Sequence, residues 1–222
     1  MGLPLSSLRR WLRRLGYGWK RCRRSRKAPR DAAPFAACQQ PLRALHAAQA
    51  RGEVAVGYGD ECRFSPQAPV PYAGQVRGQP PLALPAVRGS GGHSVLGFWQ
   101  AGVAGQPLPA YCRVGALTAD LLALAVDEFS QTLRAPTGLV LANASIHKAL
   151  LVRARHPEWA ARGLRLLFLP PYSPELNKIE RLWHRCKHYW VRPEDYQTDR
   201  TLLERVEYVL QRIGTTYTLT FA

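Results

Sequence analysis

The chain has 222 residues, 46% of them hydrophobic, which suits one medium domain with a sizeable core and a small appendage. Its 31 lysines and arginines against 15 acidic residues give a formal net charge of +16. Such an excess is typical of proteins that bind DNA or RNA, with a solvated basic surface as the alternative. No apolar run of about 18 residues occurs, and none follows the basic N-terminus, so we expect neither a membrane partner nor export.

The N-terminal 30 residues hold eleven of the basic residues and no acidic one. Leucines at three- and four-residue spacing predict an amphipathic helix over 5–15, capped by Ser6 or Ser7 and ended by Gly16. Residues 17–27 have no period and predict an extended linker, which suits contact with a nucleic-acid backbone or is a solvated tail. The candidate DNA-binding residues here are Arg9, Arg10, Arg13, Arg14, Lys20, Arg21, Arg23, Arg24, Arg26 and Lys27.

Hydrophobic patterns predict the order β-β-β-α-β-α-β-α after a first helix, which is typical of an α/β sandwich with a mixed sheet. The proline- and glycine-rich stretch 66–92 predicts loops and short edge strands. Five cysteines without a Cys-x-x-Cys pair predict neither a zinc site nor a disulfide framework. Helices are predicted at 36–50, 118–133 (with Thr118 as N-cap), 145–155, 176–190 and 199–213. Strands are predicted at 54–58, where the chain runs into a turn over 59–64, and at 94–103, 139–141 and 164–169.

Two acidic residues stand where they could do chemistry. Asp60 follows the first hydrophobic strand, where a side chain can project from a sheet end into a cleft, although Gly-Asp is also a good turn sequence. Glu180 falls in the first turns of a helix that begins near Pro174 or Asn177. With Asn177 as N-cap, a capping box is as good an interpretation of Glu180 as catalysis.

Other polar residues receive simpler interpretations. Glu61 is assigned no catalytic role, and Asp127, on a helix, is predicted to be solvated. His147 is predicted to be a helix-start or core histidine. Lys187 lies seven residues after Glu180 on the same helix face, so it either contacts DNA phosphate near the cleft or is solvated.

The segment from Leu169 to Lys187 carries a long and specific motif. It reads Pro-Pro-Tyr-Ser-Pro-Glu-Leu-Asn-Lys-Ile-Glu from Pro170 to Glu180. The segment resembles the third catalytic motif of the DDE transposases of the mariner superfamily, in the bacterial insertion-sequence branch. In that family the final Glu completes a triad of acidic residues.

The remaining motifs follow in the order of the same family. Residues 58–64 resemble the first motif, in which Asp60 is the metal ligand, and residues 139–147 resemble the second. Roughly residues 36–195 align with the catalytic domain. The basic region 5–30 resembles the tail of the DNA-binding part.

The resemblance implies an RNase H-like fold, a mixed sheet flanked by helices over 34–222, after a basic helix and linker over 1–33 that remain from a DNA-binding region. It implies DNA cleavage and strand transfer of an insertion sequence, at TA targets, with Mg²⁺ or Mn²⁺ held by carboxylates that include Asp60 and Glu180. The implied partners are double-stranded DNA, a second copy in a homodimer on DNA, and a first-frame DNA-binding protein, all in the bacterial cytoplasm at the nucleoid.

One position departs from the family pattern. Where the second motif has Asp, this chain has Ala142, and 37 residues separate it from Glu180, a spacing that suits the family. Alanine cannot bind a metal ion, so we predict weakened metal binding and little or no strand transfer. The explanations are a deliberate substitution, decay of a mobile-element copy, or a displaced ligand. Asn143 offers an oxygen but points to the opposite face if the strand continues.

Two other functions are alternatives to a transposase that lacks one metal ligand. A non-enzymatic, DNA-binding relic would regulate or compete with active copies, and its DNA affinity would not depend on Mg²⁺. A cellular RNase H-like nuclease would cut without joining, and the Pro-Pro-Tyr-Ser-Pro string disfavours it.

Overall fold

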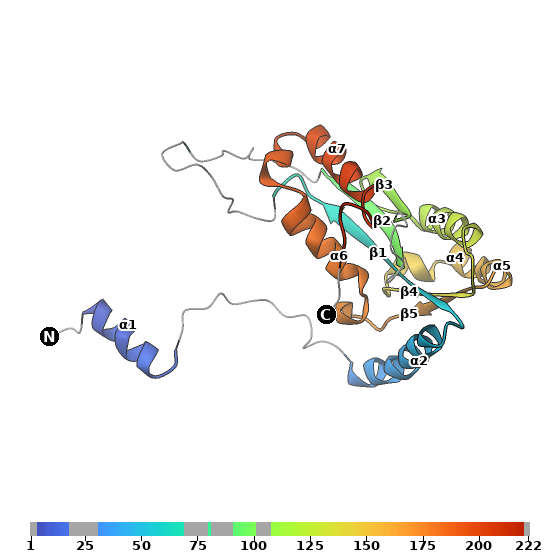
Figure 1. Ribbon diagram of the computed structural model, residues 1–222, viewed down its shortest axis with the longest axis horizontal. Coiled ribbons are helices and arrows are strands. Elements are labelled where there is room, and N and C mark those ends of the chain that lie inside the picture. Colours follow the sequence, from blue (N-terminus) through green and yellow to red (C-terminus); the bar gives the residue numbers. More distant parts are fainter. Residues whose placement is uncertain (1–3, 18–30, 69–79, 81–90, 101–107, 220–222) are drawn as a thin grey trace.

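A five-stranded mixed sheet forms the centre of the molecule, in the order β3-β2-β1-β4-β5 (Figure 1). The computed structural model describes residues 4–17, 31–68, 80, 91–100 and 108–219. β1 pairs antiparallel with β2 and parallel with β4, so the strand direction changes at β1. The strands are β1 (Ala55–Phe64), β2 (His93–Gln100), β3 (Ala110–Val114), β4 (Thr137–Leu141) and β5 (Leu164–Phe168).

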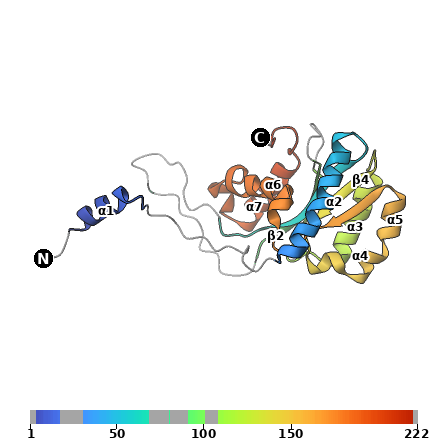
Figure 2. The same ribbon diagram turned by 90° about the horizontal axis from the view of Figure 1, so that it is seen from below.

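Helices cover both faces of this sheet (Figures 1 and 2). One face packs against α2, α6 and α7, in a hydrophobic cluster that includes Tyr58 and Trp183. The other packs against α3, α4 and α5, in a cluster that includes Phe98 and Trp159. The helices are α1 (Leu5–Arg14), α2 (Ala32–Ala50), α3 (Ala119–Gln131), α4 (Leu150–Ala154), α5 (His156–Ala161), α6 (Ile179–Arg185) and α7 (Asp199–Leu210).

This architecture confirms the predicted fold class and element order. β4 is buried at every position, as its apolar run Leu139–Leu141 indicates. The Thr118 hydroxyl caps α3 by accepting a hydrogen bond from the backbone N–H of Leu121. In the part of the chain that the structure describes, no helix is long and apolar enough to cross a membrane.

Three local predictions are wrong. β1 runs on to Phe64, so Asp60 lies inside a strand and not in a turn. The helix expected over 145–155 is divided, because Ala149 is extended (φ −56°, ψ 143°) between a 3₁₀ helix and α4. The residue before α1 is Pro4, and no side chain caps this helix.

The segment that contains α1 stands apart from the sheet (Figure 1). None of its residues is buried, and the exposed leucines on one side face away from the four arginines by helical spacing. Most of the expected linker and the proline- and glycine-rich stretch 66–92 lie outside the described residues, as do Lys20, Arg21, Arg23, Arg24, Arg26 and Lys27.

Candidate active site

Asp60 lies near the middle of the central strand. Side chains alternate across a strand, so Asp60 shares the face of Tyr58 and Cys62, which belongs to the cluster packed under α6 and α7. Only 7% of its surface is exposed. A carboxylate this deep requires a partner, because burial alone disfavours its charged form.

Two contacts bring the start of α6 above Asp60. The side-chain amide of Asn177 donates a hydrogen bond from Nδ2 to the Gly59 carbonyl oxygen at 3.0 Å. One turn into α6, the Trp183 ring lies over Gly97, where a Cβ atom would come within 2.8 Å of the ring. Because Gly97 is the β2 partner of Asp60, this close approach is possible only with glycine at that position.

Glu180 meets Asp60 from this helix. It lies in the first turn of α6, and its carboxyl group shares a hydrogen bond with that of Asp60. Burial, followed by the negative charges of Glu180 and Glu61, raises the pKa of Asp60 well above its usual range. No side-chain cap forms at α6, so the capping-box interpretation of Glu180 is wrong.

Ala142 follows the last paired residue of β4. β1 and β4 run parallel, with Gly59 opposite Leu141 as the final pair, so the next position of each strand brings residue 142 beside Asp60. Residue 142 lies two positions after Val140, so in an extended strand both side chains point to the same face of the sheet. That face is the one packed against α6. A longer side chain at 142 would therefore reach the space between Asp60 and α6.

A pocket of about 470 Å³ lies beside this position, and Asp60 is not among the residues that line it. Glu180 and Ala142 line it, together with Asn143, Asn177 and the exposed ring of Tyr172. Tyr172 has φ +58°, a left-handed conformation that is rare for a bulky residue. No pattern in the sequence indicates this strain, or the placement of both asparagines in the pocket.

His147 holds the turn after β4 against the back of β1. Its Nε2 lies 2.8 Å from the Glu61 carboxylate, on the face opposite Asp60, and its Nδ1 donates to the Ala142 carbonyl oxygen. The ring is fully buried. The expectation of a buried histidine is thus confirmed, while Glu61 acts as its partner across 86 positions of sequence.

The two facing carboxylates suit a hard divalent cation. Asp60 and Glu180 repel each other when both are ionised, and a cation between them would remove that repulsion. Among the described residues, no cluster of three or more His, Cys, Asp or Glu side chains could hold a metal ion. Asp60 and Glu180 offer carboxylate oxygens, the type of ligand that Mg²⁺ and Mn²⁺ prefer. They are one carboxylate fewer than the triad that the sequence motifs imply.

The basic residues predicted to bind DNA divide into two groups. Arg9, Arg10, Arg13 and Arg14 are all exposed on α1. Lys187, in contrast, is half-buried: its ammonium group lies 5.8 Å from the Phe64 ring centroid and interacts with the Cys62 thiol. Lys187 therefore faces β1 at Cys62 and Phe64, and not open solvent.

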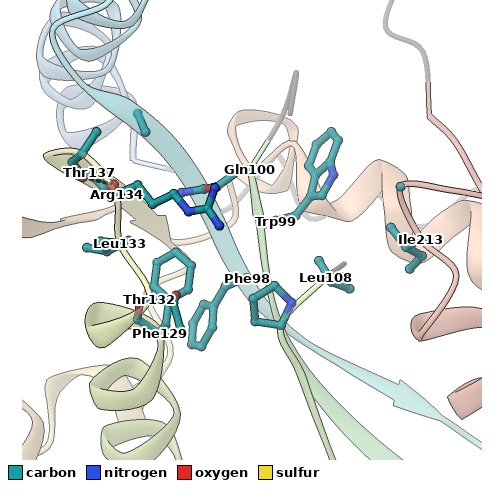
Figure 3. Close-up of a pocket in the computed structure, with 14 residues that line it drawn as sticks. Phe98, Trp99, Gln100, Leu108, Phe129, Thr132, Leu133, Arg134, Thr137 and Ile213 are labelled. Atoms are coloured by element: carbon teal, nitrogen blue, oxygen red, sulfur yellow. Dashed lines mark hydrogen bonds between the residues drawn. The ribbon is translucent and has the colours of Figure 1, made fainter. Parts of the chain in front are cut away.

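A larger cavity, of about 690 Å³, lies at the other end of β1 and β4 (Figure 3). Phe98, Phe129 and Leu108 supply apolar walls, and Arg134 and Gln100 extend into it (Figure 3). No carboxylate lines this cavity among the described residues. The two adjacent acidic residues, Asp60 and Glu180, thus lie away from this cavity, and we take their surroundings as the candidate active site.

Comparisons with known proteins agree with this geometry. The fold is that of RNase H-like transposase catalytic domains: a structure described as "Mos1 transposase paired-end complex with left transposon end" superposes with a TM-score of 0.59 at 16% identity, over 92% of this chain and 62% of that one. Two others superpose with TM-scores of 0.52: the "Mos1 Strand Transfer Complex", at 15% identity over 91% of this chain and 67% of that one, and the "mariner Mos1 paired end complex with Mg", at 16% identity over 96% and 72%.

The family follows from the sequence match. The model of the DDE superfamily endonuclease family matches residues 55–203, well over half of the chain, so the chain belongs to that family. The chain spans 62% of the length of the first of these transposase structures. No curated protein matches it.

Proposed function

We propose that this chain is the catalytic domain of a DNA transposase of the mariner type, from the bacterial insertion-sequence branch, with one metal ligand missing. The observation that carries the proposal is the meeting of Asp60 and Glu180 from distant parts of the chain, with residue 142 next in register to Asp60. Family membership over residues 55–203 supports it. The proposed reaction is cleavage and transfer of element ends, at TA targets.

The proposed roles follow from the geometry. Asp60 and Glu180 would hold Mg²⁺ or Mn²⁺, which when bound polarises phosphate oxygens and activates water or a 3′-hydroxyl group. Asn177 and Trp183 keep α6 seated on the sheet, so that Glu180 stays above Asp60. Ala142 offers only a methyl group at the third position, and we therefore expect DNA binding without efficient strand transfer.

The proposed partners are double-stranded DNA and further protein. One neighbour with a TM-score above 0.5 is described as a complex with a left transposon end and another as a strand transfer complex, and the charge of +16 suits a DNA partner. We propose that residues 1–33 are the remnant of a DNA-binding region, that Lys187 contributes near the cleft, and that a homodimer forms on DNA. A first-frame protein would supply recognition of the element ends.

The decisive experiment restores the missing carboxylate. Ala142→Asp should raise cleavage and strand transfer about a hundredfold or more, because it adds a ligand that stabilises transition-state charge. The assay uses supercoiled plasmid with the cognate element ends and Mg²⁺ or Mn²⁺, with the first-frame protein supplied. Ala142→Asn is the uncharged control of equal size, and Ala142→Asp with Glu180→Gln should be inert.

A second function has one observation in its favour, the alanine at position 142 itself. A DNA-binding relic that regulates or competes with active copies needs no metal ligand there. If Ala142→Asp binds DNA as tightly as the parent chain and neither cuts nor joins it, the relic replaces the enzyme as the better account.

A further inference from the structure

Both asparagines of the chain line the pocket that contains Glu180. The sequence has only two, Asn143 and Asn177, and they approach this pocket from the turn after β4 and from the start of α6. In each, the side-chain oxygen Oδ1 is buried and has no hydrogen-bond partner among the described residues. Buried polar atoms are normally paired, so two unpaired oxygens on one pocket require an explanation, and a bound ion is one that a pocket can supply.

The orientation of the Asn177 amide is fixed by its other atom. Nδ2 donates to the Gly59 carbonyl oxygen at 3.0 Å, so Oδ1 is the atom left over. The residue is 2% exposed, and Gly59 directly precedes Asp60. The unpaired oxygen of Asn177 therefore belongs to a residue that lines the same pocket as Glu180, in a place where bulk water does not satisfy it.

Asn143 is free of the constraint that a continued strand would impose. β4 ends at Leu141, two residues before Asn143, so strict alternation of faces no longer applies and the expected opposite orientation is not required. Asn143 lines the same pocket as Glu180. Its amide oxygen stands one residue beyond the methyl group of Ala142.

We propose that the amide oxygens of Asn143 and Asn177 complete a divalent-cation site with the carboxylates of Asp60 and Glu180. The proposal rests on the proposed function for the two carboxylates and departs from it in the other ligands. Two carboxylates balance the charge of one divalent cation, and amide oxygens are ordinary ligands for hard cations. The site thus binds one cation in spite of Ala142.

With these ligands, cation binding and strand transfer are separate properties of the chain. The amide oxygens are neutral, so they hold the cation without supplying the third negative charge of an aspartate at 142. The chain as it stands is then a metal-binding protein whose DNA-joining activity is low. Asn143 and Asn177 are ligands in this site, so replacing either one lowers the affinity for the cation.

The test is a Mn²⁺ titration of the full chain without DNA, followed by the electron paramagnetic resonance signal of free Mn²⁺. We expect Asn143→Ala and Asn177→Ala each to weaken binding about tenfold, the scale of one polar interaction with a charge. Gln211→Ala removes an exposed amide at the end of α7 and should leave affinity unchanged. Circular dichroism checks the fold of each variant.

Two further variants keep the proposal falsifiable if Asn177→Ala unfolds. Asn143→Asp and Asn177→Asp add a charge at the proposed ligand positions, so each should tighten Mn²⁺ binding. A merely structural role for Asn177, through its bond to Gly59, predicts weaker binding or none for Asn177→Asp. A loss confined to one alanine variant assigns the ligand to that asparagine.

The proposal is overturned if the parent chain binds Mn²⁺ no better than Glu180→Gln, or if all asparagine variants bind like the parent. Strand transfer by Ala142→Asp is scored separately. If that variant binds Mn²⁺ and joins DNA while the parent does not bind, the amide ligands are wrong and the proposed function stands. If the parent binds through its asparagines and Ala142→Asp stays inert, the cation site stands and the transposase function fails.

Discussion

At the scale of single residues, His147 shows how the structure uses a group that the sequence left ambiguous. Both ring nitrogens face acceptors, the Ala142 carbonyl oxygen and the Glu61 carboxylate. An imidazole that donates from both nitrogens is the protonated form. Burial works against that form, but the hydrogen bond and charge of Glu61, with the bond to Ala142, outweigh it, and the pKa of His147 is raised above 6.5.

The raised pKa predicts a pH-dependent stability. A folded-state pKa above the unfolded value gives stability that is complete below about pH 6.5 and is lost as pH rises through the folded pKa. Glu61→Gln should therefore destabilise the protein by about 2 kcal/mol at pH 6 and by less at pH 9. Urea unfolding at both pH values measures this. Glu204→Gln, at an exposed ion pair with Arg200, should show no such pH dependence.

The candidate site could be predicted from the sequence in its acidic residues but not in its surroundings. Asp60 and Glu180 were found through motif order, and the structure brings them together, although their catalytic roles stay predictions. The Glu61–His147 bridge joins residues 86 positions apart, and no local pattern encodes such a pairing. The backbone of Tyr172 has no sequence signal either, because left-handed conformations are expected at glycine or asparagine.

At the scale of elements, Asp127 ties α3 to the helices that follow β4. Its carboxylate accepts hydrogen bonds from Arg162 at 2.7 Å, Arg155 at 2.8 Å and the Trp159 indole at 3.2 Å. The side chain is 18% exposed, so the expectation of a solvated residue is wrong. Helical spacing places Asp127 on α3 but carries no information on which helix packs beside it.

The Asp127 cluster predicts a loss of stability in acid. The hydrogen bond from Arg162 comes first among the causes that lower the pKa of Asp127 to about 2. A depressed folded-state pKa gives stability that is present above the unfolded value of about 3.9 and is lost as pH falls through the folded one.

Asp127→Asn should accordingly destabilise the protein by about 2 kcal/mol at pH 7, since charged hydrogen bonds are removed. The difference should shrink between about pH 4 and pH 2. Thermal unfolding across this range measures it. Asp120→Asn, in the first turn of the same helix, is the control. An equal effect of both substitutions would mean that α3 loses only a helix-end charge.

At the scale of the whole molecule, element types follow from the sequence more readily than their arrangement. Four of the five strands are expected from their apolar runs. No strand is predicted at β3, because the additional edge strands are expected within 66–92. The order β3-β2-β1-β4-β5 places β4 beside β1 although 72 residues separate Phe64 from Thr137. β1 and β4 pair in parallel, and a long crossover connects them. Only the family resemblance predicted that these two strands are neighbours.

The four arginines of α1 and the two acidic residues of the candidate site lie on different parts of this molecule. Arg9, Arg10, Arg13 and Arg14 lie on α1, which contributes no buried residue to the fold. Asp60 is buried in the sheet domain, and Glu180 is exposed at its surface, where it lines the pocket. If α1 holds DNA, its arginines act on affinity without acting on the fold, and the two properties can be separated by mutation.

Replacing the four α1 arginines by glutamine should weaken binding to double-stranded DNA and flatten its salt dependence. Each arginine–phosphate interaction contributes about 0.9 to the slope of log affinity against log salt, so removing four of them would lower the slope by up to about 3.6. Fluorescence anisotropy at several salt concentrations measures the slope. The unfolding transition should not move, because α1 has no buried residue.

The matched comparison uses single substitutions. Arg13→Gln on α1 should lower the slope by up to about 0.9, whereas Arg200→Gln, an exposed arginine at the start of α7 that pairs with Glu204, should leave it nearly unchanged. If the fourfold variant keeps the parent slope, the charge of α1 does not contact phosphate. DNA binding would then have to arise from the basic residues of the linker, 20–27, or from those of the sheet domain, where Lys187 would be the first to substitute.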